Sequence, residues 1–478
     1  MHPSVRQRQI ALLIESLQRQ NRTEERKNAA VELGQLGSVA SSAVPHLVVA
    51  TTDIDANVRT ASGSALIAID PDWKKREDVR SAVPVLISKL ESSSTSVVNA
   101  ATRVLQQIGA SSTPLLAGFL NEYPSKPACV FVLQILGGFG QEANSAVPTM
   151  LKATESQVMQ VRLASVRALI RVAIPVPEVI AALTTRLGDD FADVRVAAAE
   201  ALTSVGKAAR AAIRRLLVLL TDREDKVRAA ASAALESIGP IVAPALVEVL
   251  NTRDQERIRV WGEGLFQMFQ VQPGWVDLSG LRNLSWTFAD VVEARANLEL
   301  AHETALYLLS KFGRNASVAL ASISNTLKDP NPRVRLAGVT AIGTMEGEAA
   351  FAVPEIVPML LEERGELRVA AAKALSGISQ NWADESKIRA LVNTASGRIA
   401  VQAVEALAHA GSSGVPALVD FLNSSDRVVR EQAATTLGSM GANARSAVPH
   451  LERALTDSHA WVQAAARNAL QTITRSSV

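Results

Sequence analysis

The chain has 478 residues, of which 48% are hydrophobic but only 4% aromatic, and 49 Lys and Arg nearly balance 47 Asp and Glu. The balanced charge excludes attraction to a polyanion through net charge alone, and a single cysteine, Cys129, excludes an internal disulfide and a thiolate-clustered metal site. The first residues hold an apolar run of only five residues, whereas a signal sequence needs roughly 7–15 and a membrane span roughly 20. We therefore expect a soluble, cytoplasmic protein, with Cys129 as a buried structural thiol.

A capping helix is predicted over residues 4–20. Its apolar residues fall on one side at helical spacing, and its basic residues Arg6, Arg8 and Arg19 fall elsewhere. The terminal unit of a stacked array needs such a polar outer side.

A valine-led, alanine-rich phrase then recurs along the chain. Its clearest copy is VRVAAAEALTSVG, from Val194 to Gly206, in which Val194, Ala198 and Leu202 share one helical face. Gly206 follows the last apolar position, where helices commonly end in a left-handed residue. One such helix is too short to bury its apolar side alone. Copies begin near residues 25, 58, 97, 128, 161, 194, 227, 258, 301, 334, 367, 399, 429 and 462, and a period near 33 residues indicates a solenoid.

Each unit is predicted to contain two helices. The first is announced by Ala-Val-Pro at 43–45, 82–84, 146–148, 352–354 and 447–449, because proline suits a first helical turn. The second helix is the valine-led phrase. In the turn between them an aspartate often stands five residues before the valine, and an arginine often follows the valine. We interpret these arginines and aspartates as a structural ladder of hydrogen bonds between repeats and of helix caps, and not as a phosphate-binding site.

This arrangement resembles HEAT repeats, and most closely the short HEAT-like subtype also found in phycobilisome lyases. The resemblance covers residues 22–474 and implies an all-α, right-handed α-α superhelix of about 14 helical hairpins. We divide it into N-terminal repeats with the capping helix (1–270), an irregular aromatic-rich insertion (271–300) and C-terminal repeats (301–478), forming one continuous solenoid. HEAT proteins serve as scaffolds, transport receptors and regulatory subunits, and a minority are enzymes.

Two long steps break the period. One contains residues 68–84, a predicted loop that carries Trp73. The other contains residues 271–302, and three of the six tryptophans of the chain cluster there and just before it. They either fill the wedge between misaligned repeats or form a binding pocket, since tryptophan is enriched at interface hot spots. These tryptophans are Trp261, Trp275 and Trp286.

The second helices line the concave side of HEAT-like stacks, so their non-core positions are the expected contact surface. Six residues after the valine the side chains are mostly small or polar, and two modest basic patches interrupt this pattern. The predicted partner-binding residues are Arg103, Arg167 and Arg171 in the first patch, Tyr307 and Lys311 in the second, and the three tryptophans above. Whether the concave face or the insertion forms the main surface stays open at this point.

No catalytic or cofactor motif accompanies this surface. The sequence lacks HExxH, CxxC, P-loop and GxSxG patterns, and we expect neither a catalytic residue, nor a metal, nor a cofactor. The predicted function is a non-enzymatic scaffold or adaptor that binds a protein partner. Two alternatives are a nucleic-acid-binding protein resembling the alkylpurine DNA glycosylases and a chaperone subunit resembling the phycobilin lyases. The basic residues do not form the continuous stripe that the first alternative needs, and the chain is much longer than the second requires.

Overall fold

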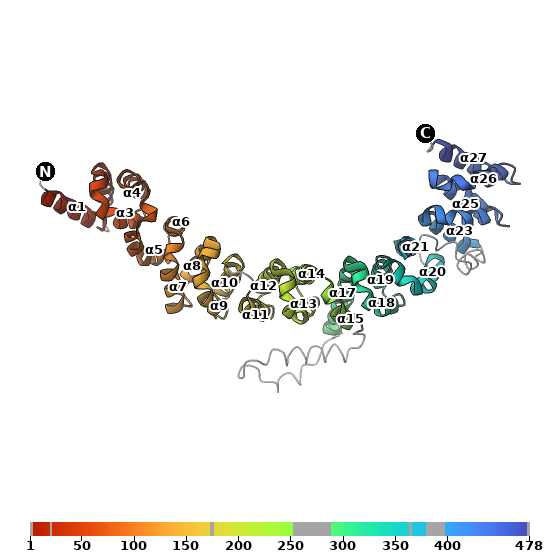
Figure 1. Ribbon diagram of the computed structural model, residues 1–478, viewed down its shortest axis with the longest axis horizontal. Coiled ribbons are helices and arrows are strands. Elements are labelled where there is room, and N and C mark those ends of the chain that lie inside the picture. The colour runs from red at the N-terminus through yellow and green to blue at the C-terminus, as the bar shows by residue number, and fades with distance from the viewer. Residues whose placement is uncertain are drawn as a thin grey trace, which may run out of the picture. The chain divides into compact units, whose positions relative to one another are not determined.

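The computed structural model describes residues 3–19, 22–172, 176–251, 288–362, 366–378 and 397–475, and every regular element in these ranges is helical. The fold class is the predicted one, an all-α solenoid of HEAT-like hairpins (Figure 1). The chain divides into two compact units, Met1–Ala212 and Ile213–Val478. Within the described residues no single helix has the length and apolarity to cross a membrane, and one pair of helical segments passes only jointly, with a bend of 110°.

The valine-led phrases form the second helices. Thirteen of the fourteen predicted copies are helical, and the copy near residue 258 lies outside the described residues. In the first unit they are α2 (Thr23–Gln35), α4 (Ala56–Ile69), α6 (Thr95–Ile108), α8 (Ala128–Phe139), α10 (Met159–Val172) and α12 (Ala192–Val205). In the second unit they are α14 (Asp225–Ile238), α17 (Phe288–Phe312), α19 (Pro332–Gly343), α21 (Glu366–Ile378), α23 (Gly397–Leu407), α25 (Arg427–Ser439) and α27 (Ala460–Arg475). Gly206 ends α12 with φ of +60°, as predicted.

Most first helices are shorter than the second helices, because the chain arrives at them through a separate 3₁₀ segment. In η1 (Gly37–Ala43), Ala40 leaves helical geometry, and α3 starts afresh at Val44 with its proline in the first turn. A proline there has no amide to continue the preceding hydrogen-bond series, so the two segments stay separate. The α-helical parts are α3 (Val44–Ala50), α5 (Val83–Lys89), α7 (Thr113–Glu122), α9 (Val147–Ala153), α11 (Pro177–Arg186), α13 (Ile213–Leu219), α15 (Ala243–Leu250), α18 (Leu320–Thr326), α20 (Val353–Glu362), α24 (Val415–Phe421) and α26 (Val448–Ala454).

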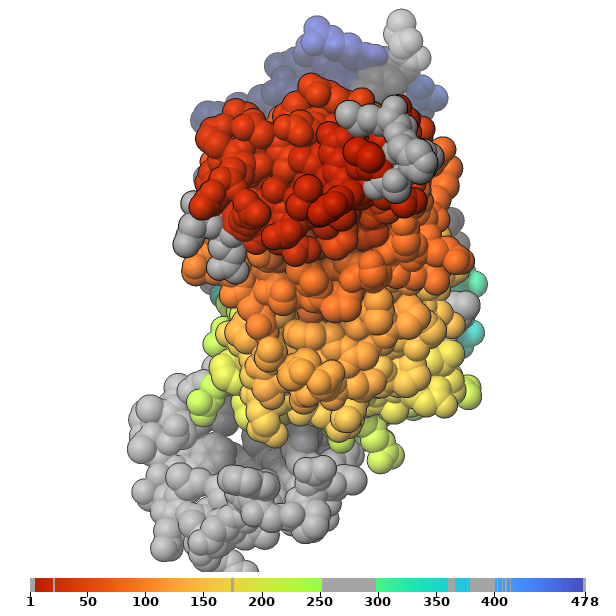
Figure 2. All heavy atoms as spheres, turned by 90° about the vertical axis from the view of Figure 1, so that its left-hand side faces the viewer, coloured from red at the N-terminus to blue at the C-terminus, as the bar shows by residue number. Residues whose placement is uncertain are grey.

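The two kinds of helix lie on opposite sides of each unit. In Figure 1, α6, α8, α10 and α12 lie on one side of the first unit and α7, α9 and α11 on the other. Their apolar sides meet between these rows, where Leu105, Leu116 and Leu136 are fully buried. Figure 2 shows the repeats of the first unit, coloured red to yellow, in continuous contact. The capping helix α1 (Pro3–Leu17) buries Ile10 and Leu17 against this stack.

Some neighbouring second helices approach through a glycine. A Cβ atom at Gly343 of α19 would lie 2.6 Å from Cα of Ala374 on α21, and one at Gly438 of α25 would lie 2.8 Å from Cα of Ala469 on α27. Both distances are too short for a real side chain, so only glycine permits this packing. The glycine on one helix and the alanine on the next therefore set how closely these helices pack.

The predicted arginine ladder is confirmed, and its carboxylate partners lie one repeat further along the chain. Nε and Nη2 of Arg162 donate to the two carboxylate oxygens of Asp189 at 2.7 and 2.9 Å. Arg26 with Asp53 and Arg430 with Asp457 form the same two-bond contact. Each aspartate also accepts a bond from the backbone N–H two residues later, so it shapes its own turn. One bidentate pair thus fixes a turn and ties it to the preceding helix.

The long step after α4 is structured. Residues 73–75 and 78–82 form 3₁₀ turns, η2 and η3, and Trp73 is buried. Arg76 donates to Asp70 at 3.3 Å, to Asp78 at 2.6 Å and to the Ser41 carbonyl at 3.4 Å. These bonds hold the extra residues against the preceding repeat.

The predicted insertion over 271–300 falls mostly outside the described residues. Its last part, residues 288–300, forms the first half of α17 and runs without a break into the second helix. The division of the chain at residues 270 and 300 stays a prediction.

Candidate binding surface

The second helices present one exposed row of side chains in each unit, which we call the second-helix face. It consists of the residues six positions after each valine, and every one of them is exposed. Its members are Val31, Ser64, Arg103, Gln134, Arg167 and Glu200 in the first unit and Ala233, Tyr307, Thr340, Lys373, Glu405, Thr435 and Asn468 in the second. The row follows from the period of about 33 residues, because successive repeats place the same position of the second helix on the same side of the stack.

The first predicted basic patch lies on this face. Arg103 stands on α6, Arg167 and Arg171 stand one turn apart on α10, and α8 lies between the two helices with Gln134 in the row. All three arginines are exposed, and none has an ion-pair partner among the residues that the structure describes. The patch is thus two separate basic points and not a continuous stripe.

The second predicted patch is built on α17. The Tyr307 side chain is 47% exposed, and Nζ of Lys311 lies 5.3 Å from the centre of its ring. Arg314, just beyond α17, forms an ion pair with Glu346, so its charge is already paired within the protein. Trp261, Trp275 and Trp286 lie outside the described residues, so their role stays a prediction.

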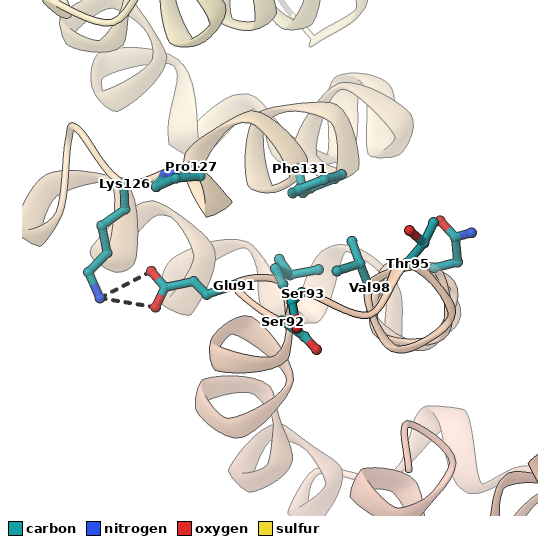
Figure 3. A pocket seen from close by; sticks show the side chains of 10 residues that line it. Glu91, Ser92, Ser93, Thr95, Val98, Lys126, Pro127 and Phe131 are labelled. Atoms are coloured by element: carbon teal, nitrogen blue, oxygen red, sulfur yellow. Dashed lines mark hydrogen bonds and ion pairs between the residues drawn. The ribbon is translucent and has the colours of Figure 1, made fainter. Parts of the chain in front are cut away.

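A hollow in the first unit was not expected. It measures about 610 Å³ and is lined by Leu90, Glu91, Ser92, Ser93, Thr95, Val98, Asn99, Lys126, Pro127 and Phe131. In Figure 3 the turn before α6 forms one wall, and Pro127, just before α8, and Phe131 of α8 form the other. Nζ of Lys126 closes one end, 3.1 Å from Oε1 of Glu91 and 4.5 Å from the centre of the Tyr123 ring.

The hollow lies where the ladder lacks an arginine. Val98 takes the position after the valine that elsewhere holds Arg26, Arg59 or Arg162, and Ser92 takes the aspartate position. The next repeat fills the same place with neutral groups: the buried Cys129 thiol donates to the Tyr123 carbonyl at 2.9 Å, and the Ser156 hydroxyl donates to the Pro124 carbonyl at 3.3 Å. The missing arginine can be seen in the sequence, because this copy of the phrase reads VVNAATRVLQQIG whereas other copies begin with Val-Arg.

Cys129 is the buried thiol that the sequence predicted. Burial raises its pKa above the ordinary value, and its Sγ bonds to a backbone carbonyl. A thiol with a raised pKa is a poor nucleophile. Among the described residues no group of three or more His, Cys, Asp or Glu side chains could hold a metal ion.

Comparison with known proteins identifies the repeat. A family model described as HEAT repeats matches residues 120–203, 180–265 and 385–471, while no curated protein matches the sequence. Similar solved structures include the karyopherin Kap121p bound to the SUMO protease Ulp1p, with 13% identity, a TM-score of 0.45, and coverage of 98% of this chain and 56% of that one. They also include a Kap95:Nup1 complex, with 13% identity, a TM-score of 0.45, and coverage of 100% and 68%.

A structure of Kap95p with RanGDP shows 12% identity, a TM-score of 0.46, and the same coverage of 100% and 68%. This chain thus spans just over half the length of Kap121p and about two thirds of Kap95p. The phycobilisome-lyase subtype stays a prediction. The recurring hairpins and the matched repeat model together show that the chain is a HEAT-repeat protein.

Proposed function

We propose that this protein is a non-enzymatic scaffold that binds a protein partner along the second-helix face. The observation that carries the proposal is the exposed row of side chains, one from each described second helix. Small and neutral polar side chains make up most of the row, with a few basic and acidic residues and one tyrosine among them. A mixed surface of this kind offers a protein many shallow contacts with a few hot spots. Tyr307 and the arginines at 103, 167 and 171 are the proposed hot spots. The proposed location is the cytoplasm, as the sequence predicts.

The charges along the row favour a protein partner over a nucleic acid. Glu200 follows Arg167, and Glu405 follows Lys373. A nucleic-acid groove would need basic residues along its whole length and exposed aromatics for stacking. We expect no salt-dependent shift of labelled DNA in a mobility assay.

The test compares two variants with matched chemistry. The first carries Arg167→Glu and Tyr307→Ala on the second-helix face, and Arg171→Glu and Lys311→Glu one turn further along the same two helices. The control carries three charge reversals and one aromatic truncation at exposed positions of the first helices and their 3₁₀ segments. Its substitutions are Lys152→Glu on α9, Arg214→Glu on α13, Arg453→Glu on α26 and Phe351→Ala in η10 (Glu346–Ala352).

Affinity capture from the source cell lysate is followed by mass spectrometry. The face variant should remain folded and lose the main protein that co-purifies with the unchanged chain, while the control should retain it. The proposal is wrong if the control loses that protein and the face variant retains it, because the partner would then dock on the first-helix side.

A further inference from the structure

We propose that the hollow beside Val98 is a recognition pocket for one arginine side chain of a partner polypeptide. The inference deepens the proposed function and rests on it for one point only, that the arginine belongs to a protein. The hollow lies at the turns that precede α6 and α8, and so its test is independent of the second-helix face.

The chain itself shows what fits this place. In six described repeats, Nη1 of the arginine after the valine donates to the two carbonyls six and five residues before it, at 2.6–3.2 Å. These arginines are Arg59, Arg162, Arg195, Arg228, Arg335 and Arg430. The pair of carbonyl oxygens in each turn is thus a guanidinium acceptor.

The turn before α6 keeps this acceptor but has lost its donor. Ser92 Oγ accepts a bond from the Ser94 N–H at 3.2 Å, as Asp53 Oδ1 does from the Asp55 N–H at 2.9 Å. Ser94 has φ of −85° and ψ of 111°, close to the −83° and 130° of Asp55. The turn therefore has the shape found elsewhere. Within the described part of the chain, no N–H or O–H donates to the Ser92 and Ser93 carbonyls, because Val98 replaces the arginine.

The remaining walls suit a guanidinium group. Phe131 faces Val98 across the hollow in Figure 3 and offers a ring on which a flat cation can stack. The chain uses the same contact elsewhere, where the guanidinium carbon of Arg162 lies 5.7 Å from the centre of the Phe191 ring. Leu90 and Val98 supply apolar surface for the aliphatic part of an arginine, and the side chains of Thr95 and Asn99 offer further acceptors.

A carboxylate is not required for this binding. Glu91 is already paired with Lys126, so the guanidinium would be held mainly by the two carbonyls and the Phe131 ring. Arg59 sets the precedent, because it bonds to the Asp53 and Ile54 carbonyls although the aspartate position of the following turn holds Ser92. A lysine ammonium, which lacks the flat fork, should bind more weakly.

The probe is Nα-acetyl-L-arginine amide, observed on the full chain by saturation-transfer difference NMR. We expect a dissociation constant in the millimolar range, typical of a single side chain, and at least tenfold less signal from the neutral citrulline analogue. The lysine analogue should also give less signal. Free L-arginine should bind no more tightly than the blocked form, because a site for a residue within a polypeptide has no use for charged termini.

The decisive variant is Val98→Arg, which supplies the missing arginine from within the chain. It should bond to the Ser92 and Ser93 carbonyls and lower the arginine signal at least tenfold, while Gln107→Arg, which adds the same charge at an exposed position of α6, should not. A second variant, Phe131→Ala, should also lower the signal, and helical circular dichroism confirms that each variant is folded.

The proposal is overturned if Val98→Arg is folded and binds the probe as well as the unchanged chain. Equal signals from the arginine, lysine and citrulline analogues would also overturn it, and tighter binding of free arginine would exclude a polypeptide ligand. These failures would leave the second-helix face variant and its partner untouched, so they are distinct from a failure of the proposed function.

Discussion

The buried Arg162–Asp189 pair gives the sharpest test of the ladder. The Asp189 side chain is 2% exposed and that of Arg162 is 10% exposed. Substituting Asp189→Asn removes the charge but preserves an oxygen that can accept from the Phe191 N–H at 3.1 Å. The change therefore isolates the ion pair from the shape of the turn.

Removing one partner of a buried ion pair costs about 3–5 kcal/mol, because the other charge stays buried without compensation. Arg162 still donates to the Ser156 and Gln157 carbonyls at 2.9 and 3.2 Å. We therefore expect the lower end, about 3 kcal/mol, which is on the order of a hundredfold in an opening equilibrium.

Repeat arrays need not unfold in one step, so the suitable measurement is native-state hydrogen exchange of the peptides that cover residues 156–200. Asp189→Asn should raise the exchange of the turn amides about a hundredfold. The control Asp72→Asn acts on an exposed pair, since the Asp72 and Lys75 side chains are 75% and 82% exposed, and should leave exchange unchanged.

A double-mutant cycle completes the test. Arg162→Met alone leaves the buried Asp189 carboxylate with only the longer 3.4 Å contact from Nη1 of Arg186, whereas Arg162→Met with Asp189→Asn removes both charges of the Arg162–Asp189 pair. The double variant should therefore cost less than the sum of the two single variants. Additive effects, or an Asp189→Asn variant as stable as the Asp72→Asn control, would refute the claim that this pair holds the two repeats together.

Three further predictions concern pH, a turn and a helix contact. Burial alone would raise the pKa of Asp189, but hydrogen bonds from Arg162 and the Phe191 N–H hold it below the ordinary value. The stability that the ionised Asp189 carboxylate contributes to the fold is therefore complete above about pH 3.9 and is lost as the pH falls through the lower pKa of the folded state. In acid unfolding followed by circular dichroism, the stability of Asp189→Asn should therefore fall less steeply with decreasing pH. Glu346 has φ of +53° where other repeats have glycine, so Glu346→Gly should stabilise by about 1 kcal/mol and delay urea unfolding, and an earlier transition would contradict this. Gly343→Ala should cost about 1–3 kcal/mol by overpacking against Ala374, whereas Gly347→Ala, with no atom within 4 Å of its added Cβ, should change the thermal midpoint little; equal midpoints would argue against a tight contact.

The sequence by itself determined the repeat and its local chemistry. The 33-residue period, the apolar face of Val194 and Leu202, and the turn aspartates are all written in neighbouring residues, because helix formation and capping depend on contacts a few positions apart. For the same reason the exposure of Arg103, Arg167 and Tyr307 followed from helical spacing alone.

Only the tertiary structure decided what meets across repeats. It shows that Arg162 pairs with the aspartate 27 residues later and not with a carboxylate of its own turn, and that Gly343 lies against Ala374. It also shows that, in the part of the chain that the structure describes, no donor reaches the Ser92 and Ser93 carbonyls, and that Phe131 lines the same hollow. A pattern within one helix cannot give these facts, because each depends on how far and in which direction the next hairpin is displaced, and that displacement is set by side-chain packing between the repeats.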